Sequence, residues 1–118
     1  MNQVGQRQIF VFGSNLAGRH GAGAALHAKN CRGAIYGQGV GLQGSSYALP
    51  TKDFTLHSLP LDKIAEYAAQ FIEFAAAHPE LEFELTAVGC GLAGYAPAQI
   101  APLFRSAPTN VCKPDAFL

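Results

Sequence analysis

The sequence has few charged residues and no long apolar segment. Charged residues make up 14% of the 118 and hydrophobic ones 49%, a composition that argues against an intrinsically disordered chain. Glycine or charge interrupts every apolar run before it reaches the length of a membrane-spanning helix. Residues 1–7 lack the hydrophobic region of a secretory signal. These absences predict a cytoplasmic protein without a membrane partner, and the length suits a single domain over residues 1–118.

Cysteine is scarce, and its spacing fits neither a metal site nor a disulfide framework. The three residues, Cys31, Cys90 and Cys112, are far apart and form no C-x-x-C pair. A structural zinc site needs closely spaced ligand pairs, and a disulfide framework needs an even number of cysteines. The sequence also lacks the dense basic stripe of a nucleic-acid groove. We therefore predict no metal, no cofactor and no nucleic-acid partner.

The charge is balanced overall but unevenly spread. Residues 1–60 carry five basic side chains against one acid, whereas residues 61–118 carry three against seven. Most of the glycines also lie in the basic half. This pairing suits a bound anion.

Apolar patterning predicts alternating strands and helices. Strands are predicted at 8–12, 34–36, 46–50 (an edge or terminal strand), 81–88 and 110–112. Helices are predicted at 22–29, 61–75 and 97–104, the last one kinked or shortened by Pro102. Such alternation predicts an α/β fold, a three-layer α/β/α sandwich with a mixed, largely parallel sheet.

Three glycine-rich loops, at 13–23, 37–44 and 89–94, interrupt these elements. Ligands of open α/β sheets bind beyond the carboxyl ends of the strands, where unpaired amides at a helix N-terminus attract phosphate. Neither of the two loops that follow buried strands is a P-loop, because no Gly-Lys-Ser/Thr occurs. One such loop alone is typical of a tight turn, but three in a small domain favour a ligand cleft.

Two of these segments resemble a known family. Residues 12–15 (Phe-Gly-Ser-Asn), followed by 21–25 (Gly-Ala-Gly-Ala-Ala), resemble the first part of a macro domain. Residues 88–95 (Val-Gly-Cys-Gly-Leu-Ala-Gly-Tyr) are similar to the second, phosphate-binding loop of that family. The resemblance covers about residues 8–112. The longer run at 12–25, together with residues 42–44 and 49–53, looks like a small bacterial and phage branch of that family. It implies a macro-domain-like fold that binds ADP-ribose and, in some members, hydrolyses ADP-ribosyl or O-acyl-ADP-ribose linkages.

The resemblance also implies a set of ligand-binding residues. In the first segment, Asn15 would meet the distal ribose through its amide, and residues 21–23 would line that ribose and the nearer phosphate. The implied residues of this segment are Gly13, Ser14, Asn15, Gly21, Ala22, Gly23 and Ala24. In the second segment, which would wrap the diphosphate, they are Gly89, Cys90, Gly91, Leu92, Ala93 and Gly94. Tyr95 would stack on or close over the sugar.

The chain departs from the family at two points. The usual first strand, with its adenine-binding aspartate, has no counterpart in residues 1–7, so the fold is shortened at the N-terminus. The subgroup with a lysine nucleophile has an aspartate where this chain has Ala93. The resemblance therefore implies neither the usual recognition of adenine nor the covalent lysine mechanism.

Several polar residues allow two interpretations. The catalytic candidates are Asn15, which otherwise caps a turn, and His20, a general acid or base that is otherwise solvent-facing or hydrogen-bonded. Arg19 either binds phosphate or stays solvated. Cys90 is better explained as a small buried side chain than as a nucleophile. Lys52 and Asp53 suit a surface turn or a local ion pair.

Three functions remain open at this point. The chain is a hydrolase acting on an ADP-ribose-type substrate, a module that binds a nucleotide metabolite without turnover, or a protein-interaction domain that has lost its ligand. The glycine loops serve the first two equally, and the lack of a strong general base other than His20 favours the second.

Overall fold

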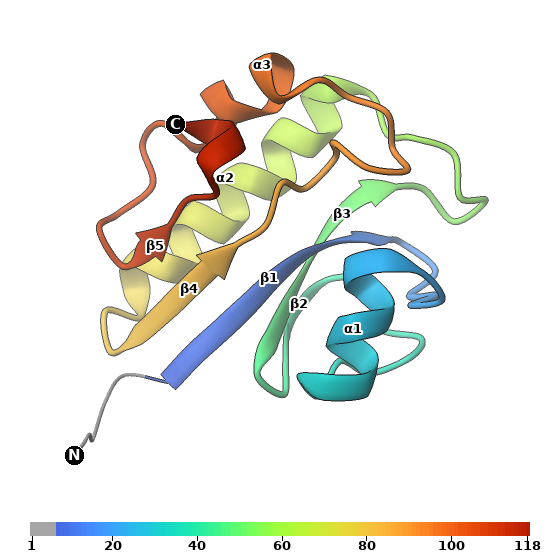
Figure 1. Cartoon of the computed structure of the whole chain (residues 1–118), viewed down its shortest axis with the longest axis horizontal. Helices are drawn as coiled ribbons and strands as arrows, with labels where there is room; N and C mark the ends of the chain where they lie inside the picture. The colour runs from blue at the N-terminus through green and yellow to red at the C-terminus, as the bar shows by residue number, and fades with distance from the viewer. Residues whose placement is uncertain (1–6) are drawn as a thin grey trace.

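The centre of the molecule is a five-stranded sheet with the strand order β2-β3-β1-β4-β5. The computed structural model describes residues 7–118. The strands are β1 (Arg7–Asn15), β2 (Gly41–Gln43), β3 (Ser46–Lys52), β4 (Leu81–Leu85) and β5 (Val111–Cys112). Four strands run parallel, and β2 alone is antiparallel to its neighbour β3 (Figure 1). The prediction of an α/β fold with a mixed, largely parallel sheet is confirmed.

Helices lie on both faces of this sheet. The helix α1 (Gly23–Cys31) lies on one face, and α2 (Leu61–Ala77) and α3 (Pro97–Ile100) lie on the other (Figure 1). Two short 3₁₀ helices, η1 (Ala101–Phe104) and η2 (Asp115–Phe117), follow α3 on the α2 face. No helix among the described residues is long and apolar enough to cross a membrane.

The α2 face holds the larger of two hydrophobic clusters. In α2, the buried positions Ile64, Ala68, Phe71 and Ala75 recur at three- and four-residue steps, as the sequence pattern predicts. They pack against strand residues that include Tyr47 and Phe83. The Phe71 ring lies edge-on to the rings of Tyr47 and Phe83, with centroids 5.1 and 5.4 Å away. Most of the buried aromatic area of the protein is therefore on this face.

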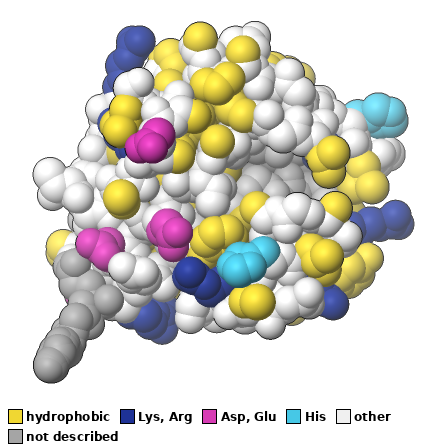
Figure 2. All heavy atoms as spheres, viewed as in Figure 1, with side chains coloured by type: hydrophobic (Ala, Val, Ile, Leu, Met, Phe, Trp, Pro, Cys, Tyr) yellow, Lys and Arg dark blue, Asp and Glu magenta, His cyan; other side chains and the backbone are white. Residues whose placement is uncertain are grey.

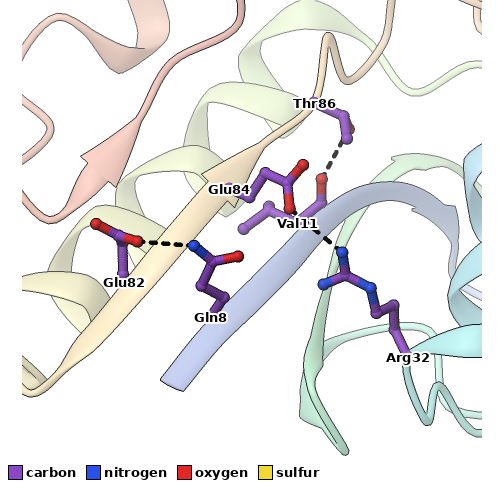
Figure 3. Close-up of polar contacts among 6 residues, drawn as sticks. All are labelled: Gln8, Val11, Arg32, Glu82, Glu84 and Thr86. Atoms are coloured by element: carbon purple, nitrogen blue, oxygen red, sulfur yellow. Dashed lines mark hydrogen bonds and ion pairs between the residues drawn. The ribbon is translucent and has the colours of Figure 1, made fainter. Parts of the chain in front are cut away.

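The α1 face holds a smaller cluster, made of Phe10, Phe12 and four alanines. Beyond it, the face over β4 is polar (Figure 3). Gln8 donates a hydrogen bond of 3.0 Å to Glu82, and Arg32 lies 3.5 Å from the Glu84 carboxylate. The Arg32 guanidinium also lies over the Phe10 ring, 5.2 Å from its centroid. No helix within residues 7–118 covers β4 on this side, and paired polar side chains lie there instead.

Four predicted elements differ from the structure. Residues 34–36 are not a strand. The Ile35 amide donates to the Gln43 side chain instead of to a neighbouring strand, and the next residues pack against the first glycine loop, where the Gly37 amide donates to the Gly18 carbonyl. The loop predicted at 37–44 contains β2. The predicted edge strand at 46–50 is β3, which lies inside the sheet between β2 and β1. The strand predicted at 81–88 ends at Leu85.

Two further predictions concern the ends of the elements. The helix predicted at 97–104 is α-helical only to Ile100 and then 3₁₀, which confirms the expected effect of Pro102. The prediction that the family's first strand is missing concerns residues 1–7, of which 1–6 lie outside the described residues.

Candidate ligand-binding site

A pocket opens where β1 extends beyond β4. The ladder between these strands ends at the pair Val11 and Leu85, and β1 continues to Asn15 along β3. The Thr86 amide and hydroxyl both donate to the Val11 carbonyl, at 3.1 and 2.7 Å, where the chain leaves the sheet (Figure 3). From here the connections of β1 and β4 run in opposite directions. Ligands of open α/β sheets bind at such a switch point.

The pocket has a volume of about 640 Å³ and lies between α1 and the loops after β3 and β4. The space-filling view shows this side of the molecule hollowed there (Figure 2). Of the predicted ligand-binding residues, those that line the pocket are Gly13, Ser14, Asn15, residues 21–24, Gly89 and residues 91–93. The structure therefore brings the first and second glycine loops together around one cavity.

The middle glycine loop, at 37–44, has a different role. None of its residues lines the pocket. A Cβ atom on Gly39 would lie 2.3 Å from the Asn15 carbonyl oxygen, and one on Gly44 would lie 2.6 Å from the Gly33 carbonyl oxygen. These glycines allow close backbone packing, which is the tight-turn interpretation of such a loop.

Backbone amides face the pocket from two sides. At the start of α1, Ala22 makes no side-chain cap, and the first intrahelical bond runs from the Leu26 amide to the Ala22 carbonyl. The amides of residues 23–25 therefore have no intrahelical acceptor. In the second loop, the amides of residues 91–93 have no acceptor among the described residues. Such uncapped donors at a helix start attract anions.

The charge of the pocket lining is positive. Arg19 and Lys52 line it, and the described residues of the lining include no carboxylate. The ion pairs of the described residues are Arg32–Glu84 and Lys63–Glu66, so neither cation of the pocket is neutralised by a pair. The structure shows no local ion pair between Lys52 and Asp53. Lys52 ends β3 instead and faces the cavity.

Asn15 holds the loop that carries Arg19. Its Nδ2 donates to the Arg19 carbonyl, and its Oδ1 accepts from the Arg19 amide, both at 2.9 Å. The turn-capping interpretation of Asn15 is therefore seen directly, although the residue also lines the pocket. Ser14 lines the pocket too, but its hydroxyl donates to the Gly39 carbonyl at 2.6 Å. Both side chains organise the first loop.

His20 is fully buried and does not line the pocket. Its Nε2 lies 3.0 Å from the Gln38 carbonyl and 3.3 Å from the Gln43 Oε1, which itself accepts the Ile35 amide at 2.7 Å. Both neighbours of Nε2 are acceptors, so Nε2 carries the proton. The ring packs edge-on to Phe12, and Nδ1 has no partner among the described residues. The hydrogen-bonding interpretation of His20 is observed, and a catalytic role stays a prediction.

Three predicted residues of the second loop lie outside the lining. The Tyr95 hydroxyl donates to the Leu59 carbonyl, which holds the ring against the core. Cys90 is half-buried against the same cluster, and this burial raises the pKa of its thiol. A raised pKa favours the neutral thiol over the nucleophilic thiolate. Gly94 has a positive φ of 85° and turns the chain. All three shape the loop from behind.

The lining also contains apolar residues that were not predicted as ligand-binding, and the exposed ones with large side chains among them are Tyr36 and Leu56. Leu56 has a φ of 68° in the turn at 53–57. A left-handed backbone costs a residue with a Cβ roughly 1–2 kcal/mol. The Asp53 carboxylate holds this turn by accepting hydrogen bonds from Thr55 and His57. The Thr55 hydroxyl and the His57 amide lower the pKa of Asp53. No motif or periodicity marked either apolar residue.

Comparisons with known proteins identify no relative of this chain. No family model, no curated protein and no solved structure matches it. Residues 7–118 also contain no group of three or more histidine, cysteine or acidic side chains that would hold a metal ion. The interpretation of the pocket therefore depends on its own geometry and charge.

Proposed function

We propose that this protein binds ADP-ribose, or a closely related nucleotide diphosphate, in the pocket between α1 and the loop after β4. The proposal includes a macro-domain-like, three-layer α/β/α architecture. One observation carries it. Uncapped backbone amides from two loops, together with Arg19 and Lys52, face a single cavity whose described lining has no carboxylate.

The size of the cavity supports a ligand larger than a free phosphate ion. Its volume of about 640 Å³ lies within the range of typical small-molecule sites. The two loops also meet at its floor, since a Cβ atom on Gly13 would lie 3.6 Å from the Gly89 amide nitrogen. A diphosphate between them accepts hydrogen bonds from both sides.

The lining favours binding without turnover over hydrolysis. Water attack on a ribose needs a general base in contact with the reacting group. The described lining contains no histidine, cysteine or carboxylate. His20, the base predicted from sequence, is buried behind the first loop with Nε2 hydrogen-bonded. Hydrolysis of ADP-ribosyl or O-acyl-ADP-ribose linkages is the second candidate function, and an assay for released ADP-ribose tests it.

Calorimetry with ADP-ribose tests the proposal. Removing both pocket cations in an Arg19→Ala/Lys52→Ala variant should weaken binding about a hundredfold, because each charge-assisted hydrogen bond contributes at least about tenfold. The matched control, Lys29→Ala/Arg105→Ala, makes the same charge change at two exposed residues outside the lining and should bind like the wild type.

Three results would change this conclusion. Equal affinity of the two double variants for ADP-ribose would show that Arg19 and Lys52 do not contact the ligand. Release of ADP-ribose from ADP-ribosylated substrates would make the protein a hydrolase. Absence of heat with ADP-ribose and with related nucleotides would leave the protein-interaction domain as the remaining candidate.

A further inference from the structure

Three large apolar side chains stay exposed around the pocket. They are Tyr36 (58% exposed), Leu56 (41%) and Leu92 (79%), and all three line the cavity. They come from three separate loops, and none is a buried member of either hydrophobic cluster. We call them the apolar rim. Exposed apolar groups gathered at one place mark a binding surface.

The backbone at Leu56 is held in a conformation that favours glycine. Its φ is 68°, and the Asp53 Oδ1 accepts the Thr55 and His57 amides at 2.8 and 3.0 Å to close the turn. A leucine there raises the free energy of the fold and adds nothing to the core. Backbone strain of this kind clusters at ligand-binding and active sites.

The turn that carries Leu56 is tied to the loop that carries Leu92. The Ser58 hydroxyl donates to the Ala93 carbonyl at 2.6 Å, and Ser58 also forms a bridge with Lys52 at the end of β3. The two leucines therefore keep a fixed relation to each other and to the pocket cation Lys52. A rim of this kind is preorganised for a flat, apolar group next to an anion.

Most polar side chains of the described lining are already engaged elsewhere. The hydroxyls of Ser14, Thr51 and Thr86 donate to backbone carbonyls, and the proposed function assigns the two cations to the phosphates. The lining contains no aspartate, glutamate or glutamine. The amide of Asn15, the one carboxamide there, has both ends bonded to the Arg19 backbone. Stacking contacts the flat face of a base, and every base has such a face. Discrimination between adenine and guanine needs hydrogen bonds to the edge of the base.

We propose that the apolar rim holds the face of the nucleotide's base, so that the site binds the base without discriminating between adenine and guanine. This inference rests on the proposed function, because the diphosphate must first be seated beside Arg19 and Lys52. It assigns Tyr36, Leu56 and Leu92 to affinity for the base, and the glycine loops to affinity for the phosphates.

The test compares ADP, GDP and ribose 5-phosphate by calorimetry. Wild-type protein should bind ADP and GDP within about threefold of each other, since stacking tolerates either base. Leu56→Gly should weaken both by about tenfold, from the lost apolar contact, and leave ribose 5-phosphate unchanged. Glycine adopts a positive φ freely, so the melting temperature of this variant should not fall.

Two further variants complete the design. Leu92→Ser removes the most exposed member of the rim and should also weaken ADP without changing ribose 5-phosphate. Phe54→Ala is the matched control, because Phe54 is exposed in the same turn but lies outside the lining. It should bind every probe like the wild type.

Two results would overturn the inference while ADP-ribose still binds. One is unchanged ADP affinity in both rim variants, and the other is a preference of the wild type for one base of more than about tenfold. A failure of the proposed function looks different, because wild-type protein would then bind neither ADP-ribose nor ribose 5-phosphate.

Discussion

The two faces of the sheet differ in the size of their hydrophobic clusters and in the space that they leave beside the strands. The α2 face buries a large cluster with several aromatic rings in mutual contact, and it covers strands from β3 to β5. The α1 face buries two phenylalanines and four alanines and leaves β4 to paired polar side chains. Small side chains on the α1 side leave room at the carboxyl ends of the strands, where the pocket opens. We therefore expect substitutions that alter the proposed ligand binding at the pocket to cost little stability, and substitutions in the α2 cluster to cost much.

The largest effect is expected from the α2 face. Phe71→Ala removes a fully buried ring that contacts Tyr47, Phe83 and Phe104, and should lower the free energy of unfolding by about 3–5 kcal/mol. Urea denaturation measures this. Leu26→Ala on α1, where the side chain is 37% exposed, is the control and should cost well under that amount. Similar losses of unfolding free energy in the two variants would show that the two faces contribute equally to stability.

A smaller loss of stability but a large loss of binding is expected in the second glycine loop. Gly91 lines the pocket, and a Cβ atom added there meets no atom within 4 Å. Gly91→Val should therefore keep the fold while its side chain fills the space for the phosphates. Binding of ADP-ribose should weaken by more than about tenfold in calorimetry. A melting temperature like the wild type's with undiminished affinity would show that no phosphate sits at this loop.

The smallest effect concerns acid. Hydrogen bonds from Thr55 and His57 lower the pKa of Asp53 in the folded protein. The ionised carboxylate therefore stabilises the turn at 53–57 fully at pH values above the ordinary aspartate pKa. That contribution disappears as the pH falls through the lowered value. Titration of the Asp53 carboxyl by NMR should show a pKa below the ordinary aspartate value, and Thr55→Val should raise it. An ordinary aspartate pKa for Asp53 would show that its carboxylate does not stabilise the turn.

Sequence patterns predicted the parts of the fold that depend on local rules. The helical stripe from Leu61 onward, ended before Pro79, and the buried run of β1 were sufficient for α2 and β1. The two glycine loops that follow β1 and β4 were also predicted, although β1 extends through residues 13–15 of the first one. They lie close together because parallel strands bring their carboxyl ends to one edge. Hydrophobic periodicity and the positions of the glycines therefore indicated where the pocket lies, whereas the order of the strands in the sheet was not predicted.

The rest depends on contacts between distant residues. β2 forms in a glycine-rich segment because β3 lies beside it and pairs with it. Residues 34–36 form no strand because the Ile35 amide donates to the Gln43 side chain and not to a strand partner. Tyr36 and Leu56 reach the pocket only because their loops fold back over the sheet. Local propensity carries no information about such placements.

The sheet ends on both sides in very short strands, three residues in β2 and two in β5. Long, flat edges offer unpaired backbone to other molecules and promote fibril growth. The short edge strands of the described residues offer little of that template, so we expect concentrated solutions of the protein to stay free of cross-β assemblies.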